Sequence, residues 1–195
     1  MNTTNPILGA IIDWGKNHHI KDRIRQAYQQ RGGWEGWVQL ELAIYLEDFF
    51  LNNKYPDCEI KVTREEYTYG ETQKRSDILF MTTKSAYHIF YNAIELKCEA
   101  KNTGAAGFKL EVKKDCEKVD NAKPKGSFAP CTTWVVAFST TPDANLSDLK
   151  VGQRKLEKYK DTIPIVQDLE ITLWWGTRDV KESQVKDEDS KMEDN

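Results

Sequence analysis

Asp77, Glu95 and Lys97 are the residues of this chain whose types and spacing are best suited to chemistry. Asp77 lies in the run 75–80, and Glu95 and Lys97 lie at the end of the run 92–97. Each run has the apolar composition of a β-strand. Two carboxylates and an ammonium group from neighbouring strands could hold a divalent cation against a phosphodiester, because Mg²⁺ prefers one or two carboxylates together with water and phosphate oxygens.

These three side chains can share one face of a sheet. Residues two apart in a strand project to the same face, so Glu95 and Lys97 point together. If Asp77 lies on the adjacent antiparallel strand, its carboxylate stands next to Glu95 and the two can share one ion. The alternative is a structural salt bridge from Lys97 to Asp77 or Glu95 at a solvated sheet edge. The spacing alone leaves both interpretations open, although unpaired charges on apolar strands are costly to bury.

The hydrophobic periodicity predicts an α/β fold, with one domain over residues 1–178. Apolar residues at helical spacing predict helices over 5–30, 34–52, 108–120 and 146–160. Alternating or wholly apolar β-prone runs predict strands over 59–64, 75–81, 86–97, 132–138 and 169–175. This order predicts a central mixed β-sheet flanked by helices on both faces. Residues 179–195 contain seven acids and three lysines, and we expect them to form an acidic disordered tail.

The order of these elements and the pattern of Asp77 followed by Glu95-x-Lys97 resemble the core of the PD-(D/E)XK nuclease superfamily. Ser76 stands where that family often has proline, and the resemblance covers residues 34–138. It implies a restriction-endonuclease-like core and a Mg²⁺- or Mn²⁺-dependent nuclease, with DNA favoured over RNA and an endonuclease favoured over an exonuclease. It also implies that Asp77, Glu95 and the Leu96 carbonyl bind the metal, while Lys97 positions the nucleophile and stabilises charge.

The superfamily usually adds an acid from the helix before the strands, and this helix offers Glu41 and Glu35. Glu41 is the predicted metal-binding and catalytic acid, because it is embedded in the most apolar stretch, where a carboxylate is hardest to explain without a cation. Glu35 has a structural explanation as a favourable charge at the positive end of the helix dipole. Gln39 could face the site and bind substrate, or it could belong to a polar stripe.

Lysines of the helix expected at 108–120 are candidates for substrate binding. Lys109 and Lys113 are four residues apart and share a face, so either could contact a phosphate. A solvated helix face balanced by Glu111 and Glu117 explains them equally well.

Composition limits the partners and the setting. The net charge is −3, and since the tail contributes −4, the body carries +1. Phosphate binding would therefore depend on local clusters of basic residues. Four widely spaced cysteines without a Cys-x-x-Cys motif argue against a zinc site. The lack of a signal-like N-terminus and of a long apolar run predicts an intracellular protein with no membrane partner.

Two functional classes stay open. The first is a metal-dependent endonuclease, for which a homodimer would suit double-strand cutting. The alternative is a catalytically inactive module of the same fold that binds nucleic acid or a partner protein. The intact pair of acids with a lysine favours the enzyme, whereas the near-neutral body favours the module. A coincidental motif in an unrelated α/β protein is a weaker third alternative.

Overall fold

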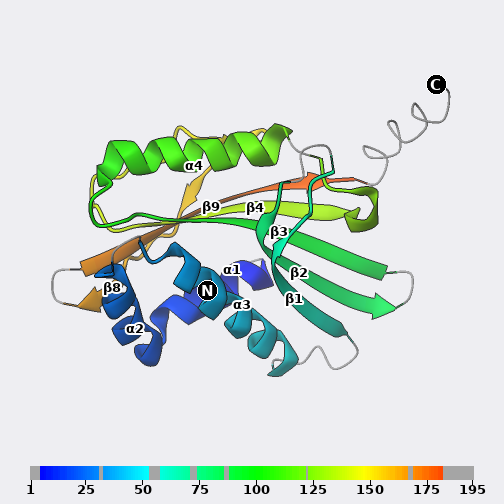
Figure 1. Cartoon of the computed structure of the whole chain (residues 1–195), viewed down its shortest axis with the longest axis horizontal. Coiled ribbons are helices and arrows are strands. Elements are labelled where there is room, and N and C mark those ends of the chain that lie inside the picture. The colour runs from blue at the N-terminus through cyan, green and yellow to red at the C-terminus, as the bar shows by residue number, and fades with distance from the viewer. Residues whose placement is uncertain are drawn as a thin grey trace.

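A mixed, largely antiparallel β-sheet is the centre of the molecule, and helices cover both of its faces (Figure 1). This computed structural model describes residues 5–30, 33–52, 58–70, 74–85, 88–121, 123–166 and 169–181. The helices are α1 (Pro6–Lys16), α2 (His18–Tyr28), α3 (Glu35–Asn52) and α4 (Gly104–Asn121), with a short 3-10 turn at Gly126–Phe128. The expected α/β class with a mixed sheet is thereby confirmed.

Within the described ranges, the sheet has seven strands in the order β1-β2-β3-β4-β9-β7, with β8 also paired to β9. Its longer strands are β1 (Glu59–Glu66), β2 (Ser76–Ser85), β3 (His88–Cys98), β4 (Cys131–Ser139) and β9 (Leu169–Val180). The shorter ones are β7 (Glu157–Lys158) and β8 (Ile163–Val166), and a separate hairpin consists of β5 (Lys150–Val151) and β6 (Arg154–Lys155). Strands β1 to β3 form an antiparallel meander, α4 then crosses over the sheet, and β4 returns parallel to β3.

Alternation along the central strands separates two hydrophobic cores. Trp134, Val136 and Phe138 of β4 pack with α1, α2 and α3 on one face. Val135 and Ala137 point the other way and pack against α4. Both faces of β4 are therefore buried, as its almost wholly apolar sequence predicts.

The helices that cover the first face begin at recognisable signals. The Asn5 side chain accepts the amide hydrogens of Ile7 and Leu8, and Pro6 occupies the first helical position of α1. Asn17 ends α1 in an extended conformation, and its side chain then caps α2. The single helix expected over 5–30 is therefore two helices. None of the helices in the described ranges is long and apolar enough to cross a membrane.

The helix expected over residues 146–160 is wrong. The structure has the β5–β6 hairpin and strand β7 there, followed by irregular chain. Gly152 forms the hairpin turn with a φ of 61°, a left-handed conformation that glycine adopts without steric cost. Apolar residues at helical spacing, such as Leu149 and Leu156, instead fill the core beneath α4 from extended chain.

The C-terminal boundary also differs from the expectation. Strand β9 continues to Val180, and Thr132 donates a 2.8 Å hydrogen bond to the Asp179 carboxylate. Asp179 is thus part of the sheet rather than of an acidic tail. Residues 182–195 lie outside the described residues.

We expect two glycine substitutions to have opposite effects on stability. A Cβ at Gly176 of β9 would stand 2.5 Å from Leu156 Cδ2 and 3.2 Å from Val151 Cγ2, so Gly176→Ala should lower the free energy of unfolding by about 1–3 kcal/mol. A Cβ at Gly36 of α3 would meet no atom within 4 Å, so Gly36→Ala should raise it by roughly 0.5–1 kcal/mol. Urea denaturation of both variants measures this difference, and equal effects would contradict the packing around β9.

Candidate functional site

Strands β2 and β3 place Asp77 and Glu95 opposite each other. The two strands are antiparallel with Ile78 paired to Ile94, so the next residue pair outward is Asp77 with Glu95. Their side chains project to the face covered by α4, because Ile78 and Ile94 belong to the core on the other face. Lys97 lies two residues beyond Glu95 and shares its face.

Each of the two strand carboxylates already has hydrogen-bond donors. Asp77 Oδ2 accepts the Leu96 amide at 2.6 Å. Glu95 is 1 % exposed, and its carboxylate accepts the Tyr69 hydroxyl at 2.9 Å and the Lys118 ammonium of α4 at 2.6 Å. Leu96 itself points its side chain into the opposite core. Only its amide has a described contact with Asp77, so metal binding by its carbonyl stays a prediction.

Lys97 bridges two helices that approach from opposite sides of the sheet. Its ammonium lies 3.0 Å from Glu35 Oε1, in the first turn of α3, and 3.7 Å from Asp115 Oδ2 of α4. The other oxygen of Glu35 accepts the Cys98 amide at 3.1 Å. We call the set Glu35, Asp77, Glu95, Asp115, Lys97 and Lys118 the carboxylate cluster.

Burial raises the pKa values of the strand and α4 carboxyls. Desolvation is the main cause for Glu95, whose pKa rises from 4.5 to about 7 because the nearby Lys118 offsets burial only in part. Burial likewise raises the pKa of Asp115 to about 6, with Lys97 acting against it. The pKa of Asp77 is also raised by burial, although its bond from the Leu96 amide opposes the shift.

The acidic neighbours of Lys97 raise its pKa and so outweigh the effect of burial. Burial alone would lower its pKa, but Asp115 and Glu35 together raise it to about 12. The Lys97 ammonium therefore stays charged across the physiological range.

The donor chemistry of the carboxylate cluster fits a hard divalent cation such as Mg²⁺ or Mn²⁺, which binds oxygen ligands. Four carboxylates face two ammonium groups, which leaves an excess of two negative charges when all are ionised. Asp115 Oδ2 is buried without a hydrogen-bond partner. Within the described ranges, no three acidic, histidine or cysteine side chains form a group that could hold a metal as they stand. An ion shared by Asp77 and Glu95 would need Lys118 to withdraw from Glu95.

The structure does not bring Glu41 into the carboxylate cluster. Glu41 accepts two hydrogen bonds from Arg23 of α2, at 3.1 and 3.2 Å, and lines a cavity between α2 and α3. The acid of α3 that reaches Lys97 is Glu35. Gln39 is buried, and its side-chain oxygen accepts a 3.1 Å hydrogen bond from Arg64.

The two lysines predicted to bind substrate are occupied elsewhere. Lys109 pairs with Asp148 at 2.6 Å, and Lys113 pairs with Glu117 at 3.7 Å. The lysine of α4 that reaches the cluster is Lys118. Substrate binding by Lys109 or Lys113 stays a prediction without a described contact to the cluster.

Asp115, Lys118 and Tyr69 are members or neighbours of the site that sequence reasoning missed. Asp115 had a readable signal: Phe108, Val112, Cys116 and Val119 form the buried stripe of α4, and Asp115 stands next to Cys116, seven residues after Phe108 and on the same side of the helix. A carboxylate in an apolar stripe that faces a sheet requires a cationic neighbour. Tyr69 had no such signal, because its position depends on an isolated bridge to Pro124.

Comparison with known proteins does not add a family. No protein-family model, curated protein or solved structure matches the chain.

We expect the metal-free protein to lose stability as pH rises from about 4.5 to 7. The pKa of Glu95 is higher in the folded chain than its ordinary 4.5, so the folded state holds the proton over this interval and the unfolded state does not. For one carboxyl, the slope approaches about −1.4 kcal/mol per pH unit. Glu95→Gln should flatten the curve, measured by urea denaturation in EDTA, whereas Glu117→Gln, at an exposed position of α4, should not. Parallel curves for the wild type and Glu95→Gln would show that folding does not raise the pKa of Glu95.

Proposed function

We propose that this chain is a Mg²⁺- or Mn²⁺-dependent nuclease of the PD-(D/E)XK kind that cuts DNA internally. The observation that carries the proposal is the placement of Asp77 opposite Glu95 on adjacent strands, with Lys97 two residues on and on the same face. Carboxylates from two strands next to an ammonium group are suited to hold a metal ion and a phosphate together.

The connectivity supports the same proposal. Helix α3 precedes the antiparallel meander β1–β3, and α4 crosses over to β4, which pairs parallel to β3. This is the order expected of a restriction-endonuclease-like core. The helix before the strands and the crossover helix each contribute an acid, Glu35 and Asp115, to the surroundings of Lys97.

Each residue then has a role that its contacts support. Asp77 and Glu95, with the Leu96 carbonyl, would hold the ion, which when bound supplies an acidified water and neutralises charge on the phosphate. Glu35 and Asp115 fix the Lys97 ammonium from two sides, so that Lys97 positions the nucleophile and stabilises the developing negative charge. Glu35 takes the place first assigned to Glu41.

Two basic side chains that share the Tyr67 ring, Arg75 and Lys125, support a nucleic-acid substrate. The Arg75 guanidinium lies 4.2 Å from the centre of the Tyr67 ring and donates to the Tyr67 hydroxyl, and Lys125 Nζ lies 5.7 Å from the same ring. Arg75 precedes Asp77 by two residues. The Lys118 ammonium donates a 2.6 Å hydrogen bond to the Arg75 carbonyl and another to the Glu95 carboxylate. Two cations held over an exposed tyrosine at the edge of the cluster could bind a phosphate that flanks the scissile one. Glu65 and Glu66 also lie close enough to act on Arg75.

The inactive module is the second candidate, and the lysine contacts favour it. Lys118 lies at 2.6 Å from Glu95 and Lys97 at 3.0 Å from Glu35, so the ammonium groups already compensate two carboxylates. Titration calorimetry with Mn²⁺ separates the candidates: binding that Asp77→Asn and Glu95→Gln abolish supports the enzyme. Absence of binding supports the module.

We expect Asp77→Ala, Glu95→Ala and Lys97→Ala each to abolish metal-dependent cleavage, with the fold retained. Incubation with plasmid, circular single-stranded DNA and RNA in Mn²⁺ measures the activity, and circular dichroism checks the fold. Asp77→Ala removes one of two opposed carboxylates, so its thermal stability should stay level or rise. A large loss of stability would instead identify a structural salt bridge, and full activity in excess EDTA would refute the metal.

A matched pair of variants on α3 tests which glutamate belongs to the site. Glu35→Gln removes the charge beside Lys97 and should lower the cleavage rate by about tenfold or more, because a misplaced catalytic group loses much of its effect. Glu41→Gln alters the contact with Arg23 outside the cluster and should leave the cleavage rate at saturating substrate within about twofold. The reverse ranking would restore Glu41 as the helix acid.

Substitution of Arg75 should weaken binding of single-stranded DNA through charge alone. Fluorescence anisotropy in EDTA, where no cleavage occurs, is followed over a range of salt concentrations. For Arg75→Ala the slope of log K against log salt should become less negative by roughly 0.7, the value for one lost phosphate contact. Lys160→Ala, at an exposed position between β7 and β8, is the control and should leave the slope unchanged. An unchanged slope for Arg75→Ala would remove Arg75 from the substrate path.

A further inference from the structure

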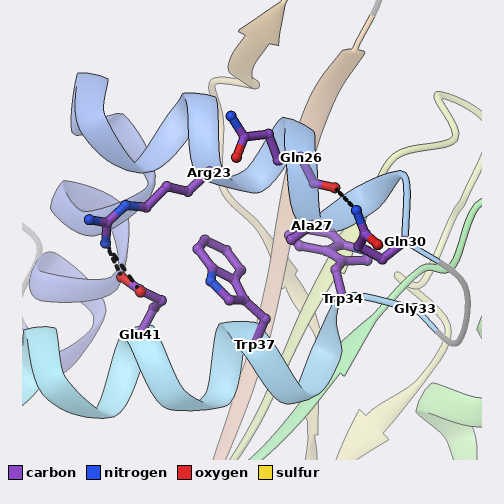
Figure 2. Close-up of a pocket in the computed structure, with 8 residues that line it drawn as sticks. All are labelled: Arg23, Gln26, Ala27, Gln30, Gly33, Trp34, Trp37 and Glu41. Carbon is purple, nitrogen blue, oxygen red and sulfur yellow. Dashed lines mark hydrogen bonds and ion pairs between the residues drawn. The ribbon is translucent and has the colours of Figure 1, made fainter.

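A cavity of about 390 Å³ lies between α2 and α3, next to the residues at which α3 begins. Figure 2 shows Trp37 rising from α3 toward α2, with the Arg23–Glu41 pair on one side of its ring and Trp34 with Ala27 on the other. The other lining residues are Gln26, Gln30 and Gly33. Trp37 is half-buried, and its ring centre lies 6.4 Å from that of Trp14 in the core. One edge of the indole is thus anchored while the ring borders open space.

The chemistry of the lining restricts what the cavity can bind. The guanidinium of Arg23 is neutralised by both oxygens of Glu41, so a free anion meets no uncompensated cation among the described residues that line the cavity. Within the part of the chain that the structure describes, Glu41 is the one carboxylate that lines the cavity, too few for a metal ion. What remains is an aromatic face together with two amide side chains. Gln30 uses its nitrogen to donate to the Gln26 carbonyl at 3.4 Å and keeps its side-chain oxygen as an acceptor.

An aromatic face bordered by amides suits a planar heterocycle with donors and acceptors on its edge. Nucleobases have this form: every base has a face that stacks on an aromatic ring, and a glutamine amide matches the donor and acceptor that adenine offers. The volume is sufficient for one base.

The cavity is joined to the carboxylate cluster through the backbone. Gly33 and Trp34 line the cavity, and the next residue is Glu35, which holds Lys97. The Trp34 indole also donates to the Glu99 carbonyl at 2.9 Å, two residues after Lys97. A strand that passes the cluster over the first turn of α3 would therefore reach the cavity within a short distance.

We propose that this cavity is a nucleobase pocket, in which a base of the substrate strand, adenine being the best match, stacks on Trp37 and is held by Gln26 and Gln30. The inference deepens the proposed nuclease function and rests on it for the source of the base. The pocket selects for an unpaired base, because a base within a duplex does not offer its face.

Binding of two single-stranded oligonucleotides of equal length tests the pocket, one an oligo-dA and the other an abasic sugar-phosphate strand. Anisotropy in EDTA measures affinity without cleavage. The wild type should bind oligo-dA more tightly than the abasic strand. Trp37→Ala should weaken binding of oligo-dA by about fivefold to a hundredfold, the effect of one lost stacking contact, and leave the abasic strand unchanged.

Two further variants, with Gln29→Ala as their control, cover the case that Trp37→Ala does not fold. Trp37→Phe retains an aromatic face and should keep most of the preference for oligo-dA. Gln26→Ala should reduce that preference severalfold, whereas Gln29→Ala, a neighbouring glutamine that does not line the cavity, should not. Equal binding of both oligonucleotides by the wild type, or equal losses on both in Trp37→Ala and Gln26→Ala, would overturn the pocket.

The outcomes also separate the pocket from the nuclease. Cleavage in Mn²⁺ together with no base-dependent binding would refute the pocket and leave the nuclease. Base-dependent binding that requires Trp37, without cleavage under any metal condition, would support the pocket and favour the inactive module.

Discussion

Asp77 and Glu95 face each other across two paired strands, and the surrounding residues have to compensate the repulsion between their carboxylates. Glu95 is almost wholly buried, so water cannot screen it. Lys118 from α4 and the Tyr69 hydroxyl supply partial compensation, and the Leu96 amide does the same for Asp77. A second set of acids, Glu35 and Asp115, then surrounds Lys97. The result is a cluster with more negative than positive groups, which is a costly arrangement for stability and a suitable one for a cation.

The sheet topology explains why the compensating groups come from α4. Strands β3 and β4 are parallel, and a parallel pair requires a crossover of a dozen or more residues, usually a helix on one face. The 18 residues of α4 provide it, and the helix has to pass over the face to which Glu95 and Lys97 point. The same stripe of α4 that packs on Val135 and Ala137 can therefore carry Asp115 and Lys118 to the strands. Core packing and the geometry of the cluster both follow from the α4 crossover that connects β3 to β4.

Much of the fold follows from local sequence, whereas the partners of the charged groups do not. The apolar runs of β2, β3 and β4 and the helical spacing of α3 and α4 are local signals, and each led to the correct element. The helix predicted over 146–160 is wrong because Leu149 and Leu156 also satisfy a helical period. Only the turn at Gly152 indicates extended chain. The expectation that Glu41 is embedded in an apolar core failed for a related reason. Its neighbours Leu40 and Ile44 are apolar in sequence but 44 % and 52 % exposed, so Glu41 does not lie in a core, and Arg23 reaches it from a different helix.

Helix geometry explains why Glu35 contacts Lys97 whereas Glu41 contacts Arg23. Six residues along an α-helix correspond to about 9 Å of rise and to a rotation that leaves the two side chains about 120° apart. One helix can therefore direct Glu35 toward Lys97 and Glu41 toward α2, but a single site cannot receive both. The turn at which α3 begins thus connects the cavity at Trp37 to the carboxylate cluster: Gly33 and Trp34 line the cavity, and Glu35 contacts Lys97. Because Trp34 is buried and bonded to the end of β3 through the Glu99 carbonyl, this turn is fixed relative to Lys97. A strand bound at both places would be held in one register, which is what positioned cleavage of a phosphodiester requires.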